Sequence, residues 1–379
     1  MTSQKSFRVF ATCDIGEDAL NLLRSRGYQV EVYDKPEPPP KQLVLEKLRS
    51  GIDGLITTLR DPIDAEVFEA GGETLKVVSQ DAVGFDNVNR TDANKYRIPF
   101  TNTPDVLTEA TAEFAFFIMG ALARKLWPSE RLVRDNQWGA WHPYLPFLGD
   151  EVTGKTVAVI GTGRIGLAFM KKCVGMDVNI LCYDPAYQNN DFVRTIQEIM
   201  DLRRKHGLSR DHATIRYTTF EDAIKNADYA SVHVPLIREG EGPTPTYHLF
   251  NEQTLRTMKP TAYLVNTSRG PVVSEQALAK ALRERWIAGA ALDVFEKEPL
   301  PADSPLRDPA IEDRCRLFNH FASGARITRL STDPMKGMAG RCVQGLIDVL
   351  EGNYGGDLTK MPYVVNKEAF RDEDENAAD

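Results

Sequence analysis

The sequence predicts an α/β protein with two parallel-sheet domains. Its 379 residues are enough for two domains that each bury a core. Short apolar runs alternate with helix-like stretches along most of the chain, a pattern typical of sheets covered by helices. One apolar run, Val157-Ala158-Val159-Ile160, leads directly into the glycine-rich loop Gly161-Thr162-Gly163-Arg164-Ile165-Gly166.

The first hundred residues predict the first sheet. We expect strands at 8–11, 28–32, 54–57 and 75–79, because each is a short apolar run bounded by turn residues. Lys35-Pro36-Glu37-Pro38-Pro39-Pro40 follows the second run. Since consecutive prolines cannot form a helix, this stretch predicts a surface loop.

The remainder predicts a long connecting helix and a second sheet. Residues 108–123 have a helical pattern that could join the two domains. Strand patterns recur at 156–160, 178–183, 230–234, 262–266, 288–294 and 316–319, which predicts a doubly wound parallel sheet of six strands. Residues 187–217, with a charged helix around 192–205, and residues 238–247 interrupt the spacing and are interpreted as surface insertions of unassigned role.

Composition argues against several classes of protein. A net charge of −8 opposes binding to a nucleic-acid backbone, which needs a basic surface. The five cysteines have no paired spacing, so we expect neither a metal site nor disulfides, and a cytoplasmic location. Residues 1–5 lead at once into the first strand, which leaves no room for a signal peptide. The most apolar run, 114–123, is shorter than the roughly 20 residues that span a membrane.

The glycine loop predicts a nucleotide site. Gly161 permits a tight turn, Gly163 lets the backbone approach a pyrophosphate, and Gly166 allows a helix to pack closely on the strand. A helix expected at 167–174 would present its N-terminal amides to the anion. A strand before the loop and a helix after it make this pattern more specific than a bare glycine motif.

Asp184 ends the second strand of this sheet, 18 residues beyond Gly166. A carboxylate at this place can accept hydrogen bonds from the adenosine ribose and repels a 2′-phosphate, so NAD is favoured over NADP. The alternative is that Asp184-Pro185 is merely a turn.

The carboxyl ends of the other strands carry further chemistry. They read His233-Val234-Pro235, Thr267-Ser268-Arg269-Gly270, Asp293 and Asn319-His320. Reduction of a carbonyl by a nicotinamide needs a proton donor and a cation that orients an anionic substrate, which His320 and Arg269 could supply. A carboxylate would stabilise protonated His320, and the spacing leaves both Glu296 and Glu298 as candidates. A surface salt bridge is the alternative for Arg269, and His233 is expected to make a structural hydrogen bond.

These motifs together resemble those of the D-isomer-specific 2-hydroxyacid dehydrogenases, particularly the glyoxylate and hydroxypyruvate reductase branch. The resemblance covers most of the chain. Besides the glycine loop and the strand ends, it is carried by residues 82–88, Asn102-Thr103-Pro104, residues 107–113, and Ala290-Ala291-Leu292-Asp293-Val294-Phe295-Glu296-Lys297-Glu298-Pro299.

The resemblance implies roles for individual residues. His320 would be the general acid, Glu298 its partner carboxylate, and Arg269 the group that binds and polarises a 2-oxo acid. Around Ala82, the amides of Val83 and Gly84 would hold the substrate carboxylate. The cofactor positions implied are Thr111, Gly161, Gly163, Arg164, Ile165, Gly166, Asp184, Val234, Pro235, Thr267, Ser268, Asp293, Ser323 and Gly324.

The resemblance also implies an organisation. The domains would be Rossmann-like, one flavodoxin-like and one doubly wound, with the active site in the cleft between them. Residues 1–107 and 325–379 would form a discontinuous substrate domain, and residues 108–324 the NAD-binding domain. Relatives are usually homodimers, in which a tryptophan of a segment like 138–141 reaches the neighbouring subunit.

The function implied is reversible NAD-dependent reduction of a small 2-oxo acid to a D-2-hydroxy acid. The chain departs from the family pattern at Asn319, which stands where a proline usually precedes the histidine. A second departure, Ser323-Gly324, resembles the NAD-dependent formate dehydrogenases, which are one alternative. Glu298 argues against the latter, which carry glutamine there. An NAD-sensing scaffold similar to transcriptional corepressors is the other alternative, against which the acidic composition argues.

Overall fold

The chain forms two compact units, Met1–Leu107 with Gly324–Asp379, and Thr108–Ser323. The computed structural model describes residues 6–145, 147–209 and 212–371. Met1 to Lys5, where the sequence predicts no signal peptide, lie outside the described residues.

The first unit contains a parallel sheet with the strand order β2-β1-β3-β4-β5. Its strands are β1 (Arg8–Ala11), β2 (Gln29–Val32), β3 (Gly54–Thr57), β4 (Val77–Gln80) and β5 (Phe100–Thr101). This is the flavodoxin-like order. The four predicted strands are confirmed within two residues at each end, whereas β5 was missed because two residues are too few to form an alternating pattern.

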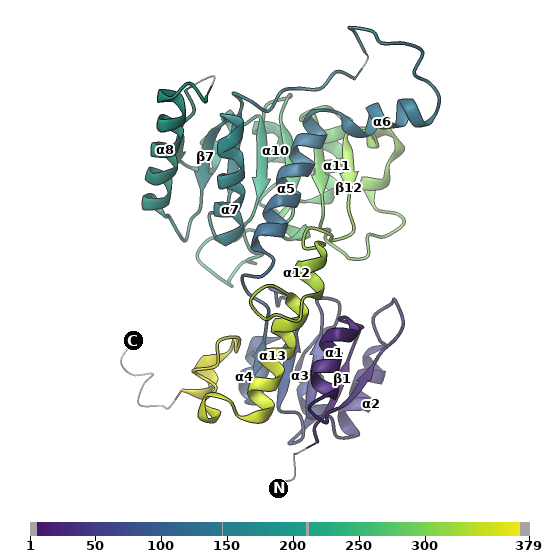
Figure 1. Cartoon of the computed structure of the whole chain (residues 1–379). Coiled ribbons are helices and arrows are strands. Elements are labelled where there is room, and N and C mark those ends of the chain that lie inside the picture. The colour runs from purple at the N-terminus through teal and green to yellow at the C-terminus, as the bar shows by residue number, and fades with distance from the viewer. Residues whose placement is uncertain (1–5, 146, 210–211, 372–379) are drawn as a thin grey trace. The chain divides into compact units, whose positions relative to one another are not determined.

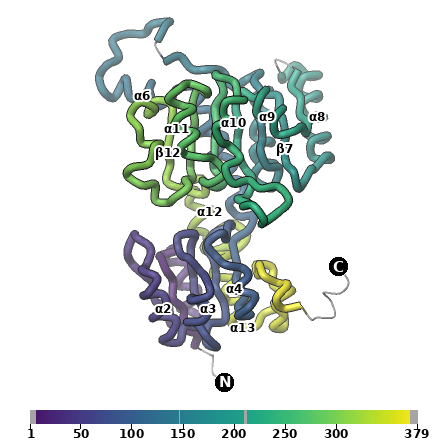
Figure 2. Tube along the Cα trace, turned by 180° about the vertical axis from the view of Figure 1, so that it is seen from behind, coloured from purple at the N-terminus to yellow at the C-terminus, as the bar shows by residue number. Residues whose placement is uncertain are grey.

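Helices cover both faces of this sheet, as Figures 1 and 2 show from opposite sides. On one face lie α1 (Glu17–Arg24) and α13 (Met338–Glu351), preceded by α12 (Arg326–Leu330); on the other lie α2 (Lys41–Arg49), α3 (Ala65–Gly71) and α4 (Arg90–Lys95). Helix α13 belongs to the returning segment and packs on β4, so the end of the chain completes the core begun by the first strands.

The second unit contains a parallel sheet with the order β12-β11-β10-β9-β6-β7-β8. Its strands are β6 (Thr156–Ile160), β7 (Asn179–Tyr183), β8 (Ile215–Tyr217), β9 (Tyr229–Val232), β10 (Tyr263–Asn266), β11 (Gly289–Leu292) and β12 (Cys315–Leu317). The order reverses between β6 and β9, which confirms the doubly wound sheet.

The six predicted strands are confirmed, but the described part of this sheet contains a seventh strand, β8, which the sequence did not predict. Strand β8 pairs with β7 and lies within 187–217, so the end of that stretch is sheet edge rather than a surface insertion. Its sequence, Ile-Arg-Tyr, is too short and too polar to stand out as an apolar run. In contrast, 238–247 contains neither helix nor strand.

The helices of the second unit also form two layers. One face carries α5 (Thr108–Ala123), α7 (Arg164–Cys173) and α8 (Asn190–Lys205); the other carries α9 (Phe220–Asn226), α10 (Glu252–Thr257) and α11 (Glu275–Arg283), and α6 (Leu126–Arg134) follows α5. Helix α7 begins three residues earlier than the sequence predicts, directly after Gly163. Short 3-10 turns occur at Val174–Met176, Gly270–Val272, Pro305–Arg307, Pro309–Ile311, Tyr354–Gly356 and Lys367–Phe370. No helix in the described ranges is both long and apolar enough to cross a membrane.

Candidate active site

The strands of the second sheet end in register, which brings the predicted site residues to one edge. Ile160 pairs with Tyr183 and Val232, and Asn266 pairs with Val232 and Leu292. The residues that follow these strands therefore start from the same edge of the sheet, where open parallel sheets bind their ligands.

Each of the three glycines of the glycine loop is needed for a different physical reason. Gly161 has a φ of +100°, and a Cβ there would lie 2.6 Å from the carbonyl carbon of His233. A Cβ on Gly166 would lie 2.1 Å from the carbonyl oxygen of Gly161. At Gly163 no described atom lies within 4 Å of a Cβ, so open space faces the backbone there. The first and last glycines are required by packing, and the middle one leaves the loop open to a ligand.

Helix α7 begins beside this opening without a side-chain cap. Gly163 is its N-cap, and its first turn contains no acidic residue. The amides of this turn and the positive end of the helix dipole favour an anion. Two buried polar atoms at neighbouring strand ends, Thr267 Oγ1 and His233 Nδ1, have no hydrogen-bond partner among the described residues. The loop, the helix end and these atoms fit a dinucleotide.

His233 has a structural hydrogen bond, as the sequence predicts. Its Nε2 lies 2.9 Å from Ser231 Oγ, and burial lowers its pKa to about 3. The imidazole is therefore neutral and cannot serve as an acid at neutral pH.

Asp184 follows β7, and its carboxylate accepts hydrogen bonds from the glycine loop. The amide of Thr162 donates to Oδ2 at 2.7 Å, while the amides of Ala186 and Tyr187 donate to Oδ1 at 3.0 Å. The acid is thus fixed beside the loop, as a ribose-binding group must be.

The other predicted cofactor positions lie on several elements. Thr111 is buried in α5, Val234 is buried after β9, Ile165 is half-buried in α7, and Arg164 and Pro235 are exposed. Ser268 Oγ accepts a hydrogen bond from the amide of Arg269. Ser323 is the last residue of the second unit and Gly324 the first residue of the returning segment.

His320 and Glu298 face each other at the ends of β12 and β11. Glu298 Oε2 lies 2.8 Å from His320 Nδ1, and Glu298 Oε1 accepts a hydrogen bond from the amide of Phe295 at 3.0 Å. Burial opposes ionisation of Glu298, but the hydrogen bonds from His320 and Phe295 and the charge of Arg269 outweigh it and lower its pKa. A carboxylate that receives Nδ1–H leaves Nε2 as the nitrogen for proton transfer.

Glu296 has different partners. Its Oε1 accepts a hydrogen bond from the amide of Glu275 at 2.7 Å, and its Oε2 lies 3.3 Å from His248 Nε2. The spacing left Glu296 and Glu298 as alternatives, and only Glu298 lies against His320.

The charge of Arg269 acts on Glu298 and lowers its pKa, and the loops that carry the two residues approach without a side chain between them. A Cβ on Gly270 would lie 1.9 Å from the backbone of Phe295. This contact joins the loop after β10 to the loop that carries Glu298. Arg269 is also held locally, since its Nη1 donates to Ser268 O at 2.8 Å and its carbonyl accepts from Asn266 Nδ2 at 2.9 Å.

Asp293 holds the loop of His320, a contact that the sequence did not reveal. Its carboxylate oxygens accept from the amides of Phe321 and Ala322 at 2.6 and 2.8 Å, and its carbonyl accepts from the amide of His320 at 2.9 Å. These bonds support the left-handed φ of +53° at His320. Because Asp293 is fully buried, desolvation raises its pKa. Strands β11 and β12 are neighbours in the sheet, so the residues that follow them, Asp293 and the loop of His320, lie side by side. A prediction of this pairing could have indicated the contact.

In the first unit, Ala82, Val83 and Gly84 follow β4. Their carbonyls accept hydrogen bonds from Thr103 N, Asn102 Nδ2 and Gln80 Nε2, respectively. Within the described residues, no protein acceptor takes the amides of Val83 or Gly84. The peptide planes are held through their oxygens while the N–H groups are available to an anion.

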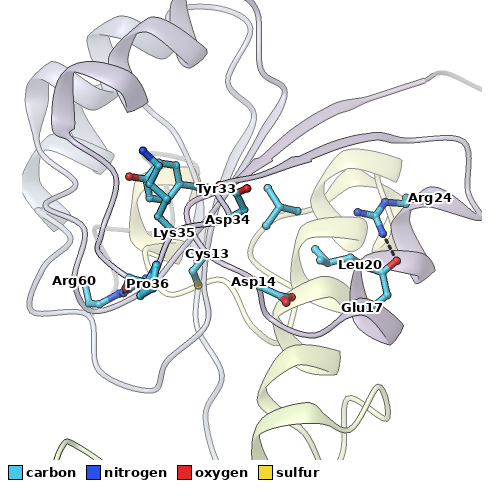
Figure 3. Close-up of a pocket in the computed structure, with 11 residues that line it drawn as sticks. Cys13, Asp14, Glu17, Leu20, Arg24, Tyr33, Asp34, Lys35, Pro36 and Arg60 are labelled. Carbon is cyan, nitrogen blue, oxygen red and sulfur yellow. Dashed lines mark hydrogen bonds and ion pairs between the residues drawn. The ribbon is translucent and has the colours of Figure 1, made fainter.

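The first unit also contains a cavity of about 490 Å³, shown in Figure 3. It lies at the ends of β1 and β2 and is bounded by α1, with Cys13, Asp34, Arg60 and the ion pair between Glu17 and Arg24 in its wall. No predicted site residue lines it.

Replacement of Gly270 by alanine tests the contact between the two loops. We expect Gly270→Ala to lower the free energy of unfolding by about 2–3 kcal/mol, because the methyl group overlaps backbone that cannot move freely. Gly175→Ala is the control, since no described atom lies within 4 Å of that position. Thermal denaturation measures both, and a Gly270→Ala protein that melts like the wild type would contradict this contact.

Comparisons with known proteins identify the family of this chain. Residues 116–322 match the family model described as D-isomer specific 2-hydroxyacid dehydrogenase, NAD binding domain. The chain is 42% identical to the glyoxylate reductase of Pyrococcus horikoshii over 368 residues, which are 96% of this chain and 97% of that protein.

Two solved structures extend the similarity over both units. The TT0316 protein from Thermus thermophilus has a TM-score of 0.78 and 33% identity, and covers 95% of this chain and 100% of its own. The NADPH-dependent glyoxylate/hydroxypyruvate reductase from Sinorhizobium meliloti, in complex with NADP and malonate, has a TM-score of 0.72 and 25% identity, and covers 97% of this chain and 99% of its own. The chain therefore belongs to the D-isomer-specific 2-hydroxyacid dehydrogenase family, and residues 116–322 carry the NAD-binding domain of that family.

Proposed function

We propose that this protein catalyses the reversible NAD-dependent reduction of a small 2-oxo acid, such as glyoxylate or hydroxypyruvate, to the D-2-hydroxy acid. The observation that carries the proposal is the 2.8 Å contact between His320 and Glu298, on the same sheet edge as the glycine loop. The reductase names of similar proteins support the choice of substrate class.

His320 is the proton donor to the carbonyl oxygen in this proposal. Glu298 remains ionised at neutral pH, because its pKa is lowered, and it therefore stabilises the protonated imidazole that the reduction direction needs. In the reverse direction the neutral imidazole removes the hydroxyl proton. The hydrogen bonds that the Asp293 carboxylate accepts from the amides of Phe321 and Ala322 hold the loop of the histidine in place during both steps.

Arg269 binds the substrate and polarises its carbonyl. A guanidinium can donate two parallel hydrogen bonds to a carboxylate and withdraws electron density from an adjacent oxo group. We propose that the amides of Val83 and Gly84 also donate hydrogen bonds to the substrate carboxylate. The carbonyls of these two residues already accept hydrogen bonds from the side chains of Asn102 and Gln80.

The proposed cofactor is NAD, held by the glycine loop, α7 and Asp184. When bound, NADH supplies the hydride to the carbonyl carbon, and the proton from His320 completes the reduction. The carboxylate of Asp184 opposes the 2′-phosphate of NADP. The remaining predicted positions at the strand ends, including Thr267 with its unpartnered hydroxyl, would line the site.

We also propose that the chain is a cytoplasmic homodimer. All five cysteines are free thiols, which suits a reducing compartment and can be checked by cell fractionation. Large apolar side chains are exposed on α5 and in the residues that follow it, and Trp141 is 79% exposed. They are Phe117, Leu126, Val133, Trp138, Trp141, Tyr144 and Leu148. Large apolar side chains that remain exposed in numbers favour an interface with another chain.

Sedimentation tests the dimer. We expect a species of twice the 42.4 kDa chain mass, and we expect Trp141→Ser to shift it toward the monomer by removing apolar contact area. A wild-type protein that sediments as a 42.4 kDa monomer at micromolar concentration would contradict the proposal.

Variants of the acid pair test the reaction. Wild-type protein should oxidise NADH with at least one of glyoxylate, hydroxypyruvate, pyruvate or a bulkier 2-oxo acid. His320→Gln should lower turnover by at least about 100-fold through loss of the general acid, and Glu298→Gln by at least about 10-fold. NADH affinity, measured by nucleotide fluorescence, should stay close to wild type in both variants.

Glu296→Gln is the matched control, because Glu296 lies two residues from Glu298 but contacts His248 and Glu275 instead. It should retain turnover. Equal losses in Glu296→Gln and Glu298→Gln would contradict the roles assigned here. NADH binding without turnover on any substrate would favour a sensing scaffold, and NAD reduction by formate would favour a formate dehydrogenase.

A further inference from the structure

The stretch 187–217, whose role the sequence left unassigned, meets the glycine loop at both of its ends. Thr162 Oγ1 donates to the carbonyl oxygen of Tyr187 at 2.9 Å. The hydroxyl of Tyr217 donates to Thr162 Oγ1 at 3.0 Å. Helix α8 lies between these residues, and Tyr217 closes β8. The first and last residues of this stretch therefore both bind the buried hydroxyl of Thr162.

The Thr162 hydroxyl has one proton and two acceptors within reach. Tyr187 O is the nearer at 2.9 Å, and Asp184 Oδ2 is at 3.3 Å. Because Tyr217 donates to Oγ1, the arrangement directs the threonine proton to Tyr187. Asp184 Oδ2 then receives one full protein hydrogen bond, from the Thr162 amide, and keeps acceptor capacity for a further donor.

Tyr217 is itself held in the donating orientation. Its oxygen accepts a hydrogen bond from the amide of Asn189 at 2.8 Å, and the Asn189 side chain caps α8 by accepting from Phe192 N. Burial raises the pKa of Tyr217, so the phenol retains its proton at neutral pH.

We propose that Tyr217 is a positioning residue that sets cofactor preference: acting through Thr162, it keeps one acceptor position of Asp184 for a ribose hydroxyl and holds the carboxylate charge against a 2′-phosphate. The inference rests on the ribose-binding role proposed above for Asp184. Residues at the two ends of the stretch 187–217 would then help to position Asp184, the acid that binds the ribose.

Binding of NADH and NADPH, followed by nucleotide fluorescence without turnover, tests this inference. In Tyr217→Phe the Thr162 hydroxyl can turn to Asp184 and compete with the ribose. We expect the Kd for NADH to rise about 5- to 10-fold, the value of one hydrogen bond, and the Kd for NADPH to rise less. The preference for NADH should fall accordingly.

A double-mutant cycle with Asp184→Ala separates a positioning role from a structural one. If Tyr217 acts through Asp184, Tyr217→Phe should change the NADH Kd less than about twofold in the Asp184→Ala background. An equal loss in both backgrounds, or an equal loss for both nucleotides, would overturn the inference.

Further variants keep the test decisive. In a Thr162→Val background no hydroxyl can turn to Asp184, so Tyr217→Phe should change the NADH Kd less than about twofold there. In a Thr162→Ser background, which restores a hydroxyl, the effect of Tyr217→Phe should return. Tyr263→Phe removes a hydroxyl that donates to Asp150, away from the loop, and should leave the preference unchanged. If Asp184→Ala leaves the preference for NADH over NADPH unchanged, both the ribose role of Asp184 and the inference are overturned. If Asp184→Ala alters this preference but Tyr217→Phe does not, the inference alone is overturned.

Discussion

The absence of a side chain at Gly270 is the constraint on which the site depends. It allows the loop after β10 to lie directly on the backbone of Phe295, in the loop after β11. Arg269 precedes this contact and Glu298 follows Phe295 by three residues, so the contact brings the cation and the carboxylate within electrostatic reach. His320 joins them because Asp293, at the end of β11, binds the two amides that follow the histidine.

In the nucleotide-binding loop, too, glycines allow backbone segments to pack directly against each other. Gly161 packs on His233, and Gly166 packs on Gly161, so the loop is fixed by contacts in which no Cβ fits. Of the three glycines of this loop, Gly163 is the one that faces open space. Glycine contacts thus fix both the loop of Arg269 and the glycine loop at one sheet edge. The Asp184 carboxylate then accepts from the Thr162 amide, and the Glu298 carboxylate lies against His320 Nδ1.

Much of the fold followed from apolar runs, but short or polar elements did not. Strands β5 and β8 were missed because two or three residues cannot establish a period. The glycine loop and Asp184 were visible because their spacing is dictated by the strand-loop-helix geometry. The choice between Glu296 and Glu298 depends on which way each side chain turns, and spacing carries no such information. The convergence of Tyr187 and Tyr217 on Thr162 joins distant residues and needed the structure.

The most direct test of hydride transfer to a 2-oxo acid is an isotope measurement. NADH labelled with deuterium at the transferred C4 position is oxidised in the presence of glyoxylate or hydroxypyruvate, and the product is analysed by mass spectrometry. We expect one deuterium on C2 of the 2-hydroxy acid for each labelled NADH consumed. Oxidation of the labelled NADH that leaves C2 without deuterium, or no hydroxy acid at all with any 2-oxo acid, would contradict the account.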